Sequence, residues 1–242
     1  MKRVMLHNPF LVALLLAGAS LAVAKDIPTK AAGKSWEPTL SPQAEAVSST
    51  GRNRFFVLEP GYQLVYQGKE GRKTVDLIIT VLEETKPVAG VETRIVEERE
   101  SADGKLVEVS RNYFAVGDQS HNVYYFGEDV DMYKNGQVTS HEGAWLAGVN
   151  GAKHGIAMPA ENKVGDKYYQ EQAPKVALDR AETVSLAETV KTPAGTFTGC
   201  LKVKETTPLE PGVGYKLYAP EIGLVQDGAL KLVRHGFVKQ GQ

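Results

Sequence analysis

Apolar and polar residues alternate along much of this chain, and that period of two is the feature that most constrains its fold. Between positions 74 and 81 every second residue is aliphatic, namely Val75, Leu77, Ile79 and Val81. Successive side chains of a β-strand point to opposite faces, so these four residues form one row directed toward a core. The run at 107–113 repeats the alternation, with valines opposite Glu108 and Ser110.

Turn sequences separate the alternating runs. Asp103-Gly104 favours a two-residue hairpin, because glycine accepts a positive φ without steric cost. Strands this close in sequence pair antiparallel. Residues 174–188 are compatible with either a helical turn or a strand, and no amphipathic segment is long enough to form a dominant helix. We therefore predict an all-β, antiparallel fold with little helix, built as a strongly curved sheet or a partly open β-barrel.

The first 24 residues are typical of a secretory signal peptide. Lys2 and Arg3 precede an apolar run that ends in Ala22-Val23-Ala24. Cleavage after Ala24 predicts a periplasmic or secreted protein with no transmembrane span after cleavage. Residues 25–51 hold few large apolar residues and several prolines, which predicts a flexible leader. Residues 52–242 are then expected to form a single antiparallel β domain.

The composition excludes several classes of protein. The formal net charge is -1, with both signs interspersed, so there is no basic stripe and we expect no nucleic-acid partner. The single cysteine, Cys200, cannot form an internal disulfide, and we expect it to be a small buried strand residue. The chain has no Gly-x-Ser-x-Gly nucleophile motif. His141-Glu142 begins like a zinc-protease motif, but Trp145 stands where the second histidine is needed.

One acidic segment is a candidate metal site, composed of Glu128, Asp129, Asp131, Asn135 and Glu142. Residues 131–142 match an EF-hand loop at several positions and predict calcium as the ion, although Tyr133 occupies a ligand position. Asn135-Gly136 is also a strong hairpin sequence, which explains the same residues without a metal. Paired carboxylates also suit glycoside hydrolysis. Both interpretations stay open, and no other cofactor is expected.

Aromatic residues form a second candidate site. A tyrosine suits a half-wet groove because it offers a ring and a hydroxyl group. We expect a ligand-binding concave face lined by Tyr66, Tyr113, Tyr125, Trp145 and Tyr168. The alternative is that these rings favour strands and pack across neighbouring strands in the core.

Several segments together resemble a known group of proteins. These segments are 53–61 (NRFFVLEPG), 125–131 (YFGEDVD), 143–145 with 158–160, 192–200 (TPAGTFTGC) and 218–225 (YAPEIGLV). They resemble a family of uncharacterised exported bacterial β proteins. The last two segments are also similar to LolA-like half-barrel periplasmic domains. That second resemblance implies an open curved sheet able to hold lipid, and neither resemblance implies a catalytic residue.

Three functions follow as hypotheses. The first is an exported, non-catalytic protein of the cell envelope that binds an apolar or amphipathic small ligand or a segment of a partner protein. The second is a carboxylate-dependent hydrolase or a cation-dependent sugar-active protein that uses the acidic segment. The third is a structural assembly factor of the envelope.

Overall fold

Antiparallel strand pairing accounts for the regular structure of the chain. The computed structural model describes residues 36–238, and every regular element in that range is a β-strand. The expected signal peptide and its cleavage site lie outside the described residues. No helix with the length and apolarity needed to cross a membrane occurs between residues 36 and 238.

The strands fall into one long sheet and one separate hairpin. The long sheet has 16 strands, and β2 (Gly51–Asn53) with β3 (Phe56–Leu58) forms the hairpin. The strands of the long sheet are β1 (Val47–Ser48), β4 (Tyr62–Glu70), β5 (Lys73–Val88), β6 (Val91–Ala102), β7 (Lys105–Gly117), β8 (Val123–Lys134), β9 (Gln137–Ser140), β10 (Trp145–Leu146), β11 (Lys153–Met158), β12 (Lys167–Tyr169), β13 (Glu171–Gln172), β14 (Arg180–Thr192), β15 (Gly195–Thr206), β16 (Gly214–Ala219), β17 (Gly223–Asp227) and β18 (Leu230–Phe237).

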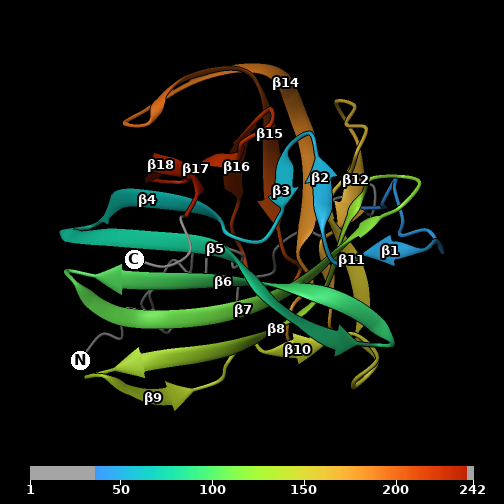
Figure 1. Ribbon diagram of the computed structural model, residues 1–242, viewed down its shortest axis with the longest axis horizontal. Coiled ribbons are helices and arrows are strands. Elements are labelled where there is room, and N and C mark those ends of the chain that lie inside the picture. The colour runs from blue at the N-terminus through green and yellow to red at the C-terminus, as the bar shows by residue number, and fades with distance from the viewer. Residues whose placement is uncertain (1–35, 239–242) are drawn as a thin grey trace, which may run out of the picture.

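The long sheet curls until it is nearly closed into a barrel. Its main order is β12-β14-β15-β16-β17-β18-β4-β5-β6-β7-β8-β11-β13, and all pairs along it are antiparallel. A seam stays unsealed between the β11–β13 side and the β12–β14 side. Figure 1 shows β4 to β8 stacked across one side of the molecule, with β14 to β18 closing the other. The predicted fold class is confirmed, and residues 180–188 of the ambiguous segment belong to strand β14.

The period-two pattern correctly identifies the inner row of β5. Val75, Leu77 and Val81 are buried, whereas Ile78 in the opposite row is exposed. The pattern in β7 has a different outcome, because Glu108 and Ser110 are buried together with Val109. Both rows of β7 are thus buried at this point of the strand. Polar side chains therefore enter the interior of this protein.

The hairpin turns follow their sequences closely. Asn135 and Gly136 have φ values of 54° and 78° and join β8 to β9 by a two-residue turn, with Lys134 paired to Gln137. Asp103 and Gly104 make the same kind of turn between β6 and β7. Positive φ at both central residues matches the right-handed twist of the strands. Both hairpin predictions are confirmed.

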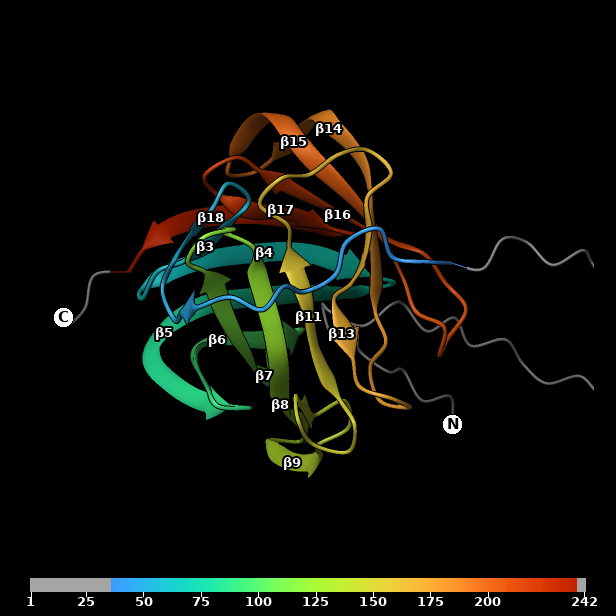
Figure 2. The same ribbon diagram turned by 90° about the vertical axis from the view of Figure 1, so that its right-hand side faces the viewer.

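The described part of the segment expected to be a leader lies against the barrel. The ring of Trp36 contacts that of Tyr169 with centroids 4.9 Å apart, and Thr39 and Leu40 donate backbone hydrogen bonds to the Lys167 carbonyl. Further along, Glu45 accepts hydrogen bonds from Ser120 on the far side of the seam. Figure 2 shows this stretch, in blue, crossing in front of β11 from the β12–β14 side to β7. Residues 36–48 thus strap the seam.

The ionised carboxylate of Glu45 fastens the strap to the segment between β7 and β8. Its carboxylate accepts hydrogen bonds from the hydroxyls of Ser120 and Tyr124 at 2.6 and 2.5 Å and from the backbone amides of Gln119 and Ser120. Burial alone raises its pKa, but these hydrogen bonds outweigh burial and lower the pKa of Glu45 to about 2. The carboxylate therefore stays ionised in all but strongly acidic solution.

Gly127 permits the close approach of β10 to β8. Its φ is 134°, and a Cβ atom there would lie 2.3 Å from the Trp145 carbonyl oxygen. We expect Gly127→Ala to lower the free energy of unfolding by about 2–4 kcal/mol, from strained φ and a backbone clash together. Gly136→Ala is the control, because its φ is 78° and no atom lies within 4 Å of the added carbon. That variant should lose only about 1–2 kcal/mol in urea titrations. Equal losses would show that the contact with Trp145 is unimportant.

Candidate functional site

Acidic side chains gather inside the barrel, and they form the main polar feature of its interior. Seven of the eight expose 6% or less of their surface, and Asp227 is half-buried. They come from six strands and from the residue preceding β14. We name them the interior acidic cluster: Glu98, Glu100, Glu108, Glu128, Glu171, Asp179, Glu205 and Asp227.

Lys216 of β16 is the buried cation that faces this cluster. Its Nζ lies 2.9 Å from Glu205 Oε2 and 3.9 Å from Asp227 Oδ2, and its side chain is only 3% exposed. Gln170 donates a hydrogen bond of 3.0 Å to the other oxygen of Glu205. Burial opposes the charged ammonium, but Glu205 and Asp227 hold the pKa of Lys216 above its usual range. Lys216 therefore keeps its positive charge inside the barrel, in contact with Glu205.

The remaining carboxyl groups are too numerous for one cation to neutralise. Burial, followed by repulsion from Glu108, raises the pKa of Glu100 to about 9. Burial raises the pKa of Glu108 to about 7. These two residues are direct partners across β6 and β7. At neutral pH the Glu100 carboxyl is therefore protonated, because two adjacent buried carboxylates would repel each other strongly.

An apolar pocket lies beside this cluster, between the β2–β3 hairpin and the inner face of the sheet. We name it the hairpin pocket. Its surface is almost entirely apolar, and its cavity volume is about 60 Å³. Glu98 and Lys216 are its charged lining residues. Its other lining residues are Phe55, Phe56, Val57, Tyr62, Leu64, Ile79, Val81, Val96, Phe114, Ala157, Tyr218, Ile222, Gly223 and Leu224.

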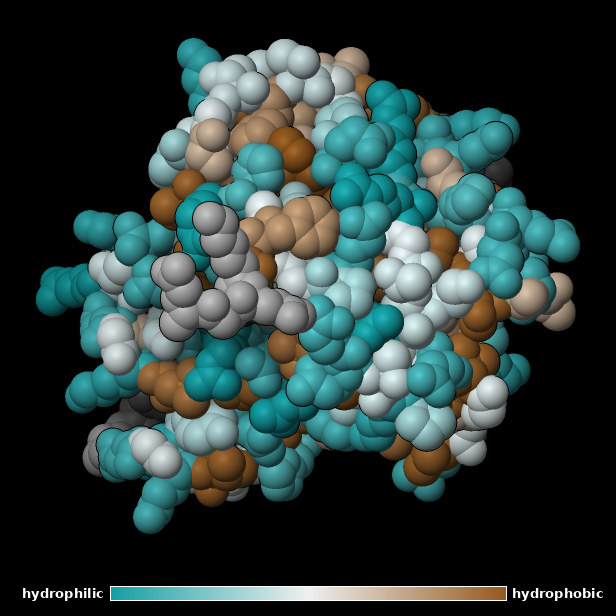
Figure 3. All heavy atoms as spheres, viewed as in Figure 1, coloured by the Kyte–Doolittle hydropathy of each residue, from teal (hydrophilic) through white to brown (hydrophobic). Residues whose placement is uncertain are grey.

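The face that carries the hairpin has no single dominant apolar patch. In the space-filling view of Figure 3, hydrophilic side chains cover most of this face, and apolar atoms gather in small separate groups among them. Exposed large apolar residues in the described chain include Val149, Val213 and Phe237, which lie on different segments. On this side of the molecule, the apolar side chains that lie together therefore line the hairpin pocket and not the outer surface.

The predicted aromatic lining is located in the core. Tyr66, Tyr113, Tyr125, Trp145 and Tyr168 expose between 0% and 6% of their surface, and none of them borders the hairpin pocket. The Tyr66 hydroxyl donates to the Leu224 carbonyl at 2.8 Å, and that of Tyr125 donates to Asn112 Oδ1 at 2.6 Å. The rings that do line the pocket belong to Tyr62, Tyr218 and three phenylalanines.

The predicted metal ligands point in different directions. Glu128 is fully buried and belongs to the interior cluster, while Asp129 and Asp131 lie on the opposite face of β8. Asn135 occupies the β8–β9 turn, and Glu142 is exposed. Within residues 36–238 no three acidic, histidine or cysteine side chains are grouped as metal ligands. Calcium binding and hydrolysis stay predictions.

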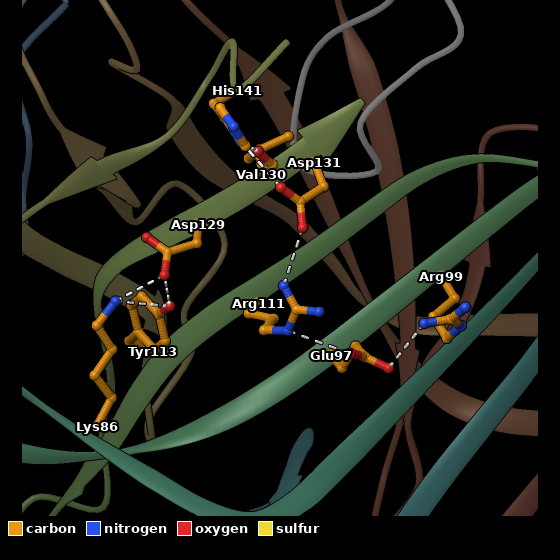
Figure 4. A network of polar contacts seen from close by, with 9 residues as sticks. All are labelled: Lys86, Glu97, Arg99, Arg111, Tyr113, Asp129, Val130, Asp131 and His141. Carbon is orange, nitrogen blue, oxygen red and sulfur yellow. Dashed lines mark hydrogen bonds and ion pairs between the residues drawn. The ribbon is translucent and has the colours of Figure 1, made fainter. Parts of the chain in front are cut away.

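Asp129 and Asp131 each have a cationic partner, as Figure 4 shows. Lys86 Nζ lies 2.7 Å from Asp129 Oδ2, which also accepts a hydrogen bond from the Tyr113 hydroxyl. Arg111 Nη1 lies 3.2 Å from Asp131 Oδ2. Burial raises the pKa of Asp129, but the hydrogen bonds from Lys86 and Tyr113 lower it further than burial raises it. This outer network is neutralised by its own partners, unlike the interior cluster.

The sequence contained one signal for the interior cluster. Val96, Glu98, Glu100 and Ala102 occupy alternate positions of β6, and both apolar members of that row are buried. A strand row that begins and ends in buried apolar residues places the residues between them on the same face. The neighbouring charges at Glu97 and Arg99 hide this signal, because the run resembles a solvated surface.

Comparison with known proteins gives one structural likeness. No family model matches the sequence, and no curated protein is significantly similar to it. A crystal structure of a candidate lipoprotein from Parabacteroides distasonis is similar at 15% identity and a TM-score of 0.38. The match covers 77% of this chain and 100% of that one. These values are too low to assign a family, so the similarity to LolA-like domains stays a prediction.

The raised pKa of Glu100 predicts how stability depends on pH. The pKa of this carboxyl is near 4.5 in the unfolded chain and about 9 in the folded chain. Between these values the folded state holds the proton and the unfolded state does not, so this contribution to stability falls as pH rises. We expect Glu100→Gln to be more stable than the parent at pH 8 by about 1–3 kcal/mol, and similar at pH 5. Denaturant titrations at both pH values measure this.

Glu84→Gln is the matched control for that measurement, because Glu84 is exposed on β5. It should change stability by less than about 0.5 kcal/mol at either pH. If Glu100→Gln also changes nothing at pH 8, the Glu100 carboxyl is solvated in the folded protein.

Proposed function

We propose that this chain is an exported, non-catalytic protein of the cell envelope that binds an apolar or amphipathic ligand in the hairpin pocket. The observation that carries the proposal is the pocket itself, which has apolar walls and two charged residues, Glu98 and Lys216. Ligand sites commonly combine apolar walls with a small number of placed polar groups. Export rests on the signal-peptide pattern of the first 24 residues.

The dimensions of the pocket favour a thin ligand. A water molecule needs about 10–15 Å³ of cavity volume measured in this way. A cavity of about 60 Å³ therefore corresponds to a few waters or a short length of alkyl chain. Phe56 and Phe114 stand over the pocket with ring centroids 5.2 Å apart. These rings pack directly against each other, so the pocket admits a narrow apolar group, such as the end of an alkyl chain or one ring of an aromatic probe.

The β2–β3 hairpin supplies a route of entry. It pairs only with itself and forms a 2-stranded sheet apart from the barrel. It is held by side chains, including Asn53, whose amide donates to the carbonyls of His121 and Pro159, and by a backbone hydrogen bond from Glu221 to the Arg54 carbonyl. Moving the hairpin therefore breaks these few contacts while leaving the ladder hydrogen bonds of the long sheet intact. Such a segment can open at lower cost than a barrel strand.

A blocking variant tests the proposal. Ala157 is buried and lines the pocket, so Ala157→Leu adds three carbons to the limited space. We expect it to weaken binding of the fluorescent probe N-phenyl-1-naphthylamine about tenfold or more, because the probe and the new side chain compete for one volume. Fluorescence titration measures the loss, and thermal unfolding checks that the variant is folded.

Ala187→Leu is the matched control, since Ala187 is exposed on β14. It adds the same side chain away from the pocket and should leave probe binding unchanged. Probe binding that is equal in all three proteins, or absent from the parent protein, would contradict the proposed function.

A further inference from the structure

We propose that the hairpin pocket selects single-chain ligands with a cationic head group, and that the head group binds Glu98. This inference rests on the proposed function and adds the chemical class of the ligand. It depends on the contacts of Glu98, on the charges that face it, and on its position in the pocket.

Glu98 is a buried carboxyl group without a partner. Its surface is 2% exposed, and neither of its carboxyl oxygens has a hydrogen-bond partner in the described chain. It lies on the inner face of β6, across from Ile79 of β5 and Ser110 of β7. Both Glu98 and Ile79 line the hairpin pocket. A buried acceptor left unsatisfied is costly, and a ligand that supplies donors at this point removes that cost.

The surroundings of Glu98 favour a positive charge. Carboxyl groups face it from β7, β8 and β17, and Lys216 of β16 is the cation that opposes them. Lys216 is itself paired with Glu205 at 2.9 Å. The titratable groups that face Glu98 are Tyr66 of β4, Glu108 of β7, Tyr125 and Glu128 of β8, Lys216 and Tyr218 of β16, and Asp227 of β17.

The same surroundings discriminate between head groups. An anionic head would add negative charge beside Glu108, Glu128 and Asp227, in a site where little water screens the repulsion. A neutral hydroxyl head supplies one hydrogen bond. An ammonium head supplies three donors and a charge, and hydrogen bonds between ionised groups are about twice as strong as neutral ones.

Binding of a cation is coupled to a proton. Burial, opposed by Lys216 and reinforced by the neighbouring carboxyl groups, raises the pKa of Glu98 and so favours its protonated form in the absence of a ligand. An ammonium favours the carboxylate, so its binding expels the Glu98 proton to solvent. The head group and the proton exchange at one site, and total charge in the pocket is unchanged.

Three ligands with the same 12-carbon chain test the proposal: dodecylamine, dodecanol and dodecanoate, each below its aggregation concentration. Displacement of N-phenyl-1-naphthylamine gives their affinities for the full-length mature protein at pH 7. We expect dodecylamine to bind about tenfold or more tightly than the other two, the difference that one charge-assisted hydrogen bond supplies. Calorimetry in two buffers of different ionisation enthalpy should show release of about one proton for each dodecylamine bound.

Glu98→Gln removes the charge and keeps the shape. We expect it to weaken dodecylamine binding about tenfold or more, to leave dodecanol within about twofold, and to abolish proton release. Glu84→Gln is the exposed control and should behave as the parent protein.

The outcomes separate the two proposals. If none of the three chains binds, the proposed function itself fails. If dodecanol or dodecanoate binds as tightly as dodecylamine, the pocket binds ligands but its head-group selectivity is not cationic. Dodecylamine binding without proton release would show that the head group does not meet Glu98, and this measurement needs only the parent protein.

Discussion

The ion pair between Lys216 and Glu205 is the interaction on which the interior of this barrel depends. Taking an ammonium out of water costs several kcal/mol, and a carboxylate in direct contact offsets much of that cost only when the remaining bonding sites are satisfied. Here Glu205 lies 2.9 Å from the ammonium and its second oxygen accepts a hydrogen bond from Gln170. Removing either member would leave an uncompensated charge among groups that already repel one another. The positive charge of Lys216 also lowers the pKa of neighbouring carboxyl groups such as Glu98 and Asp227, against the effect of burial.

Around that pair the interior divides into two halves of opposite character. The inner rows of β4 and β5 are apolar, with Leu64, Leu77 and Val81 directed inward. The inner rows of β6 to β8 carry Glu98, Glu100, Glu108 and Glu128 instead. The hairpin pocket lies where the two halves meet, since Ile79 and Glu98 are direct cross-strand partners and both line it. An amphipathic ligand matches this boundary, whereas a purely apolar ligand would leave Glu98 unpartnered.

The local alternation of apolar and polar residues was enough to predict most strands and turns. The closure of the sheet into a near-barrel determines which polar residues face inward. Alternation identified the buried row of β5, and the hairpin at Asn135-Gly136 followed from the need for positive φ at two successive residues. The acidic run at 97–100 resembles solvated surface on any single strand. Only the curling of the sheet encloses Glu98 and Glu100, and that depends on pairs such as β18 with β4, which are far apart in sequence. The burial of the aromatic candidates could not be predicted for the same reason: a tyrosine in a strand fits a groove or a core equally well.

Stability and ligand chemistry draw on the same carboxyl groups in this protein. A core filled with aliphatic side chains would contain no buried carboxyl groups. Substitution of buried ionic groups by apolar ones often stabilises a fold. The chain instead keeps Glu98 without a partner at the wall of an apolar pocket, and it holds Glu100 opposite Glu108 nearby. Sites that break a local folding rule are where function is expected, because the cost of the unsatisfied group is recovered only when a ligand binds. The energetic cost of Glu98 in the empty pocket is thus the physical basis for its proposed selectivity.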